Sequence, residues 1–288
     1  MKIVWTIDSQ CLDEGVQQCA IAALKSILSG TQAEVLPVYL YFPSSLELSS
    51  SFDADALRSV RGQAQRMLDQ LLGGPERRGV RPVKVLLQLP AGNGGPIDAI
   101  TGYADSVHAD LILAATHAHT GYARLVQGSF VETLLLHSRV PLLTVSPKTR
   151  PNGTFKDLLF ATDFSEEAWQ AFPRALEFAK ALGLTVTLFH HGTKRDADAA
   201  SREWMSAARD AGVICSLIHD DRKDVPLPQL LLDLAASSQG RVLAMVTHAE
   251  PTSPKMGTSS TRQMIEQSTV PLWTFHPPGQ ASGTAAAI

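Results

Sequence analysis

The chain has 288 residues, enough for two domains of ordinary size, and 44% of them are hydrophobic, as in globular proteins with a full core. Lysine and arginine number 25 against 28 aspartates and glutamates, and no block of like charge occurs. This balance argues against a nucleic-acid binder, which needs a basic surface, whereas a small anionic ligand needs only a few local donors.

The chain shows no membrane or secretion signal. Its first residues, MKIVWTIDSQ, reach Asp8 after a short apolar run, and no uncharged apolar run of about 18 residues follows. Three cysteines, Cys11, Cys19 and Cys215, form no CxxC pair, and their odd number and scatter indicate reduced thiols. We therefore expect a cytoplasmic protein without membrane contact.

In both halves of the chain, short apolar runs alternate with segments whose apolar residues recur at helical spacing. The expected strands of the first half are residues 3–7, 33–41, 83–89, 110–116 and 140–145, and its expected helices are 11–30, 57–74, 96–108 and 131–138. The expected strands of the second half are 157–162, 185–191, 215–219, 241–247 and 271–275, and its expected helices are 168–182, 202–211, 228–238 and 262–268. Apolar strands separated by helices predict a doubly wound α/β fold, with five parallel strands per half and helices on both faces.

Three short matches recur in the same order in the two halves. They are KIVWTID (2–8) with KDLLFATD (156–163), THA (116–118) with THA (247–249), and VPLLTV (140–145) with VPLWTF (270–275). We therefore predict two tandem domains of one type, residues 1–150 and 151–278, joined by turn formers near 148–153. The small and polar residues 279–288 are expected to be a disordered tail.

A ligand crevice is expected at the carboxyl ends of the first and fourth strands of each half, where the strand order reverses. Asp8 and the loop beginning at Thr116 would face this crevice in the first half, and Asp163 and residues 247–250 would face it in the second. The helix after the loop offers unpaired N–H groups and a partial positive charge, which favour phosphate. The pattern therefore predicts an anion site in this position.

Two longer stretches resemble the signatures of a known family. TDFSEEAWQAFPRALEFAKALGLTVTLFHH (162–191) and THAHTGYARLVQGSFVETLLLHSRVPLLTV (116–145) are similar to the two signatures of the universal stress protein family. The resemblance spans both halves of the chain and implies a tandem member with five-stranded α/β domains. It also implies that strands 140–145 and 270–275 pair the two domains about a pseudo-twofold axis, as in the dimers of single-domain members, and leaves open a homodimer of the whole chain.

The resemblance also implies a nucleotide site. Many members bind ATP through a Gly-x-x-Gly-x9-Gly-Ser/Thr loop, together with the aspartate after strand 1 and a residue of strand 2. Carried over to this sequence, the candidate cofactor-binding residues are Asp8, Val38, Thr116, His117, Gly128 and Ser129 in the first half and Asp163 in the second. The first two glycine positions hold Ala115 and Ala118, and alanine at positive φ costs about 1–2 kcal/mol. We therefore expect ATP to be a possible ligand of the first half only, at a site whose outline is retained and whose glycines are lost.

The second half departs further from the nucleotide-binding pattern. Val246 and Ala249 take the glycine positions, Glu250 adds a negative charge, and Pro251 and Pro254 remove backbone donors. We expect no nucleotide there.

Purely structural roles explain several of the same residues. Ser129 and Glu132 form a capping-box pattern, Asp8 and Asp163 can tie neighbouring loops together, and Ser165 can cap the helix that follows it. For the pair His190-His191 we expect a solvated or loop-bonding role.

Chemistry-bearing motifs are missing from the sequence. His117, His119 and His137 lack a further ligand at a recognised metal spacing, and no nucleophile motif occurs, so we predict no metal site and no catalytic residues. The leading hypothesis is a non-catalytic stress-response or regulatory protein. The alternatives are an ATP-binding switch that uses the loop Ala115–Ser129, and an enzyme such as a weak ATPase or a nucleotidyl transferase-like relative.

Overall fold

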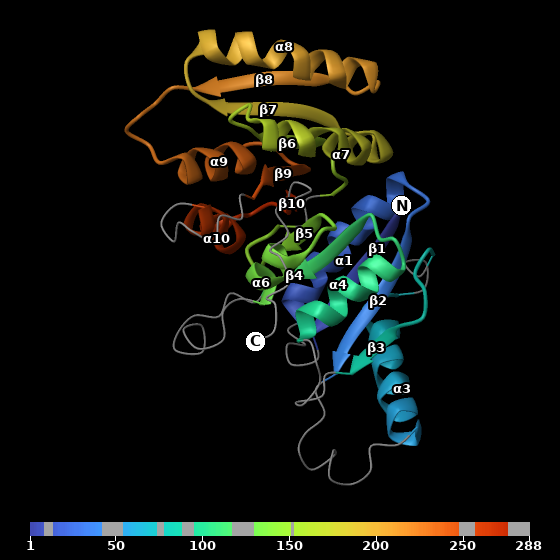
Figure 1. Cartoon of the computed structure of the whole chain (residues 1–288). Helices are drawn as coiled ribbons and strands as arrows, with labels where there is room; N and C mark the ends of the chain where they lie inside the picture. Colours follow the sequence, from blue (N-terminus) through green and yellow to red (C-terminus); the bar gives the residue numbers. More distant parts are fainter. Residues whose placement is uncertain are drawn as a thin grey trace, which may run out of the picture.

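A computed structural model describes residues 1–8, 14–41, 54–73, 78–87, 95–116, 130–150, 153–247 and 257–275. Two α/β units lie one above the other along a shared sheet, the first coloured blue to green and the second yellow to red (Figure 1).

The first unit contains β1 (Lys2–Asp8), α1 (Glu14–Gly30), β2 (Glu34–Tyr41), α3 (Ala54–Leu71), β3 (Lys84–Leu87), α4 (Pro96–Ser106), β4 (Leu111–Ala115), α6 (Phe130–His137) and β5 (Leu142–Val145). The second contains β6 (Asp157–Ala161), α7 (Glu166–Leu182), β7 (Thr185–His191), α8 (Lys194–Asp210), β8 (Cys215–Asp220), α9 (Leu227–Ala236), β9 (Arg241–Val246), α10 (Gly257–Gln267) and β10 (Leu272–Phe275). Every predicted strand and helix has its counterpart, which confirms the α/β prediction. The largest shift is at α8, which begins at Lys194 rather than residue 202, because its first buried face consists of Ala197 and Ser201, whose hydrophobic signal is weak.

The strands form one ten-stranded sheet in the order β3-β2-β1-β4-β5-β10-β9-β6-β7-β8. Neighbours within each unit are parallel, and β5 and β10 pair in the antiparallel direction at the centre. The second unit therefore repeats the topology of the first in the opposite orientation.

The helices cover both faces of this sheet as two continuous layers. Helices α1, α3, α7 and α8 contribute to one apolar cluster, and α4, α6, α9 and α10 contribute to the other. Alternate residues of β1 enter opposite layers: Ile3, Trp5 and Ile7 join the first cluster, and Val4 joins the second. Each layer runs across both units, so the two units share their apolar core.

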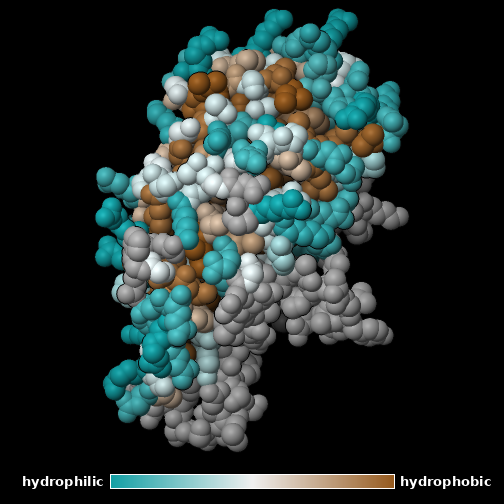
Figure 2. Space-filling view, turned by 180° about the vertical axis from the view of Figure 1, so that it is seen from behind, coloured by the Kyte–Doolittle hydropathy of each residue, from teal (hydrophilic) through white to brown (hydrophobic). Residues whose placement is uncertain are grey.

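On the face seen from behind, the described surface mixes hydrophilic and apolar side chains (Figure 2). The exposed large apolar side chains of the described residues are Leu136, Ile214 and Leu227, which lie on separate segments. None of the described helices has the length and hydropathy that a bilayer crossing requires.

The two units meet where β5 pairs with β10. Trp273 lies directly opposite Leu143, and both side chains are buried in the layer formed by α1 and α7. This pairing confirms the prediction that strands 140–145 and 270–275 join the two halves. It also gives a backbone partner to two strands that would otherwise be exposed sheet edges.

A buried ion pair ties together the strands of the second unit. Arg241 Nε lies 2.8 Å from Asp157 Oδ2, and both side chains are about nine-tenths buried. Thr185 and Thr187 donate hydroxyl hydrogen bonds to Asp157 Oδ1, each at 2.9 Å. A second nitrogen of Arg241 donates to the carbonyl of Leu234 at the end of α9. The network therefore joins β6, β7, β9 and α9.

We expect Leu143→Ala and Trp273→Ala to be energetically coupled, because the two side chains touch across the junction. Each change should lower the free energy of unfolding by about 2–5 kcal/mol, and the coupling energy should be about 0.5–3 kcal/mol. Urea denaturation of the single and double variants measures both. Leu68→Ala, at a buried position of α3, is the control, and its loss of stability should add to that of Trp273→Ala without coupling. Equal coupling energies in the two pairs would contradict the prediction.

We expect Arg241→Met to lower the free energy of unfolding by about 3–5 kcal/mol, because it leaves the buried Asp157 carboxylate without its cation. Arg58→Met is the matched control, since Arg58 pairs with Asp55 on the surface, where both side chains are 78% exposed. Loss of a surface pair costs about 0–1 kcal/mol. Similar losses in the two variants, measured by urea denaturation, would show that the Asp157–Arg241 pair adds nothing beyond a surface pair.

Candidate functional site

The candidate crevice lies at the carboxyl ends of β1 and β4. These strands are neighbours, with Thr6 opposite Ala114, so the backbones at Asp8 and Thr116 arrive at the same edge of the sheet. The helix after β1 packs in one layer and the helix after β4 in the other, which makes this the point where the strand order reverses. The structure therefore brings together the strand ends on which the sequence prediction rests.

The loop between these strand ends and α6 is only partly described. His117, Gly128 and Ser129 lie outside the described residues, as does Ala118, so their predicted roles stay predictions. Helix α6 begins at Phe130, directly after Ser129, and Glu132 lies in its first turn. The predicted capping pattern requires a helix that begins directly after residue 129, as α6 does.

Thr116 uses its backbone donor within the sheet. Its side chain and backbone are buried, and its N–H donates to the carbonyl of Val145 at 2.7 Å. Thr247 repeats the arrangement in the second unit, where its N–H donates to the carbonyl of Phe275 at 3.0 Å. In both units, the first backbone donor beyond the fourth strand is therefore already satisfied.

Val38 lies in the middle of β2, between Thr6 of β1 and Lys84 of β3. Its side chain is fully buried in the layer formed by α4 and α6. A ligand could reach this residue only through its backbone, because its side chain belongs to the core.

Asp163 is exposed and lies between β6 and α7. Its Oδ1 accepts the N–H of Ser165 at 2.9 Å, and Ser165 Oγ accepts the N–H of Ala168 at 3.3 Å. These bonds make Ser165 the N-cap of α7 and confirm the structural alternative for this stretch.

Phe164, between these two residues, has a feature that sequence analysis missed. Its φ is 63°, in the left-handed region that bulky residues rarely adopt. The ring centroid of Phe164 lies 4.9 Å from that of His190 and 5.3 Å from that of Trp204. This packing holds Phe164 over the end of β7, and only the folded arrangement of β6, β7 and α8 reveals it.

The two adjacent histidines bond to loops, as predicted. His190 Nδ1 lies 3.0 Å from the carbonyl oxygen of Thr162, and His191 Nε2 lies 2.9 Å from that of Arg222. Among the described residues, no group of three or more histidine, cysteine, aspartate or glutamate side chains is placed to hold a metal ion.

The described thiols are poorly placed for reactivity. Cys19 is buried and donates through Sγ to the carbonyl of Thr149 at 3.2 Å. Burial, followed by the negative charge of Asp157, raises the pKa of the Cys215 thiol to about 11. Cys215 is therefore a thiol and not a thiolate at neutral pH, which removes it as a nucleophile.

The chain matches a known family over its first half and solved structures over nearly its whole length. The model of the universal stress protein family matches residues 2–146. A universal stress protein from Archaeoglobus fulgidus DSM 4304 has a TM-score of 0.67 at 16% identity, with 95% of this chain and 96% of that chain covered. A functionally unknown protein from Pseudomonas aeruginosa PAO1 has a TM-score of 0.60 at 14% identity, with 98% and 94% covered. The cytoplasmic domain of a prokaryotic cation chloride cotransporter has a TM-score of 0.52 at 11% identity, with 97% of each chain covered. None of the curated proteins matches the chain.

At sequence identities this low, the similarity to these structures establishes the doubly wound fold and nothing further.

We expect alkylation of Cys215 by iodoacetamide to be suppressed in the folded protein. At mildly alkaline pH a pKa raised from 9.0 to about 11 lowers the thiolate fraction about a hundredfold. Peptide mass spectrometry after timed alkylation measures this site separately from Cys11 and Cys19, and the chain in guanidinium chloride serves as the control. Equal rates in the folded and unfolded chains would contradict the raised pKa.

Proposed function

The chain belongs to the universal stress protein family, and on that premise we propose that it is a non-catalytic regulatory protein of the stress response. In this proposal it acts in the cytoplasm as two domains divided near residue 150. The first domain retains the outline of a nucleotide site but does not hold ATP at cellular concentrations.

The proposal rests mainly on how the backbone is bonded where β4 ends. Ala115 is the last residue of that strand and pairs with Val145, and the next N–H, that of Thr116, donates to the Val145 carbonyl. A phosphate-binding loop needs free backbone donors and a backbone that a phosphate can approach closely, which glycine provides. Here the first donor is bonded within the sheet, and the strand ends in a residue with a Cβ.

The second domain supports the same conclusion through different residues. The Thr247 N–H is likewise bonded, and Asp163 accepts a bond from its own turn. Glu250, Pro251 and Pro254 follow in the sequence, adding a charge that repels phosphate and removing two backbone donors. We propose that this domain is a structural partner of the first.

The alternative is an ATP-binding switch in the first domain. It is favoured by the meeting of the β1 and β4 ends at Asp8 and Thr116, and by the position of Gly128-Ser129 directly before α6. In this alternative Asp8, Val38, Thr116, His117, Gly128 and Ser129 contact the nucleotide.

Nucleotide-binding measurements on the unchanged chain, and on a variant with glycine at positions 115 and 118, distinguish the proposal from the ATP-binding switch. Under our proposal, protein purified without added ligand contains no nucleotide by mass spectrometry, and millimolar ATP leaves its melting temperature unchanged. We expect the double substitution Ala115→Gly and Ala118→Gly to make ATP binding at least about tenfold tighter, because without the two Cβ atoms a phosphate can approach the backbone more closely. Ala115 ends β4 and is not among the described residues with a positive φ, so relief of backbone strain contributes nothing at this position. Isothermal titration calorimetry measures the gain.

The matched control is Val246→Gly with Ala249→Gly in the second domain, which should gain nothing, because Glu250 and the two prolines remain. Tight ATP binding by the unchanged chain would overturn the proposal in favour of the switch. Release of phosphate above background that is lost in Asp8→Asn would instead establish an ATPase.

A further inference from the structure

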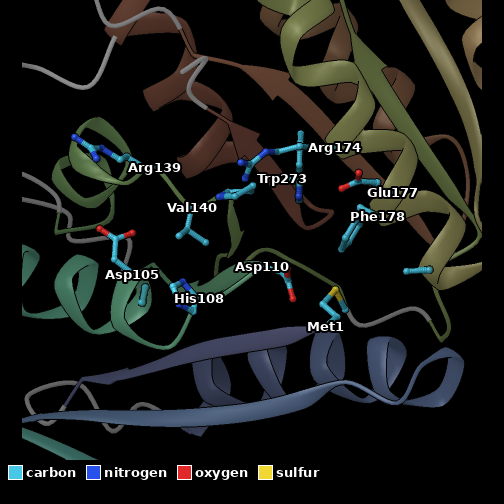
Figure 3. Close-up of a pocket in the computed structure, with 14 residues that line it drawn as sticks. Met1, Asp105, His108, Asp110, Arg139, Val140, Arg174, Glu177, Phe178 and Trp273 are labelled. Carbon is cyan, nitrogen blue, oxygen red and sulfur yellow. The ribbon is translucent and has the colours of Figure 1, made fainter. Parts of the chain in front are cut away.

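A hollow lies at the junction between the two units, away from the candidate nucleotide site. It has a volume of about 760 Å³ (Figure 3). The segments preceding β1, β4 and β5 form one wall, and α7 and β10 of the second unit form the other. These segments lie at the amino ends of the first unit's strands, opposite the edge where Asp8 and Thr116 lie. The volume is within the range of small-molecule sites.

The pseudo-twofold counterpart of this cavity is closed. The segments preceding β6, β9 and β10, together with α1, enclose only about 20 Å³. The chain that connects the two units runs there: Thr149 accepts the Cys19 thiol, the Arg150 N–H donates to the Thr269 carbonyl, and the Phe155 N–H donates to Ser26 Oγ. A single connection can fill only one side of the junction, so the tandem chain keeps one cavity open.

A stack of aromatic rings forms the apolar wall of the cavity. Trp273, only 1% exposed, stacks on Phe178 with centroids 6.2 Å apart and on Phe275 with centroids 6.1 Å apart. The guanidinium of Arg174 lies over the Phe275 ring, 5.3 Å from its centroid. The guanidinium of Arg174 therefore packs on the same row of rings.

Charged side chains of both signs surround this wall. Arg174 and Glu177 project from α7 on one side, and Arg139 and Asp105 lie on the opposite side (Figure 3). None of these four side chains forms an ion pair with any residue in the described ranges. Asp110, at the base, accepts the backbone N–H of Lys2 at 2.7 Å.

From this arrangement we propose that the cavity binds a short zwitterionic peptide, with its ammonium group toward Glu177 or Asp105 and its carboxylate toward Arg174 or Arg139. A purely anionic ligand would meet three carboxylates, and a purely cationic one would meet two guanidinium groups. A ligand with one charge of each sign can pair with both sets at once. Such a site is independent of nucleotide binding at the carboxyl edge of the sheet.

The test uses the dipeptide leucyl-phenylalanine and two capped forms of it. We expect the full-length protein to bind the free dipeptide with one-to-one stoichiometry and submillimolar affinity in isothermal titration calorimetry. Acetylation of the amine, or amidation of the carboxylate, removes one charge each and should weaken binding at least tenfold. Equal binding of the free and capped forms would overturn the proposal, as would no heat of binding at millimolar dipeptide.

Substitutions on α7 locate the site. Ala181→Trp places a bulky side chain at an exposed position that lines the cavity and should abolish binding, and Arg174→Gln should weaken it at least tenfold. Lys180→Gln, an exposed neighbour on the same helix that does not line the cavity, is the matched control and should bind normally. Circular dichroism melting confirms that each variant is folded. Unchanged binding by folded Ala181→Trp would show that the peptide binds elsewhere and would overturn the assignment.

Discussion

The antiparallel pairing of β5 with β10 is the interaction on which the rest of the structure depends. Each unit alone would end in a short apolar strand with unpaired backbone groups, and the two strands satisfy each other at the centre of the sheet. Because the pairing is antiparallel, it brings α1 and α7 into one layer and α6 and α10 into the other. Each apolar layer is therefore continuous across both units.

The same pairing sets up a near-twofold arrangement that the covalent connection then breaks. One side of the junction receives residues 146–150 and 153–155, and the backbones of Thr149, Arg150 and Phe155 bond to the Cys19 thiol, Thr269 and Ser26. The other side receives nothing from the connection and keeps a cavity walled by Trp273 and Phe178. A dimer of separate domains would have two equivalent sides, whereas a tandem chain has two different ones. The covalent connection between the units can therefore make the two sides of the junction different without any change in the fold.

The two ends of the sheet also differ in how their polar groups are used. At the carboxyl edge, the backbone amides of Thr116 and Thr247 are bonded within the sheet, and Asp163 bonds to its own turn. At the junction, Arg139, Arg174, Glu177 and Asp105 make no ion pair within the described ranges. Polar groups that already have partners favour a structural role, whereas the four exposed charges at the junction are available to pair with a ligand. This contrast is consistent with the two proposals made above: a carboxyl edge that does not hold ATP, and a junction cavity that binds a ligand.

The sequence by itself determined the repeat and the order of strands and helices, because these depend on local periodicity and on matches between segments. The pairing of the two VPL-containing strands was implied by the resemblance to the universal stress protein family. The sequence also identified Ser165 as a helix cap, since capping involves residues a few positions apart. Only the tertiary structure decided the left-handed Phe164, the buried Asp157–Arg241 pair and the cavity beside Trp273. Each of these requires residues far apart in the chain to come together: Phe164 packs on Trp204, Asp157 pairs with Arg241, and Arg174 and Arg139 line one cavity. No local pattern encodes such meetings, because they follow from how the sheet and its two helical layers close.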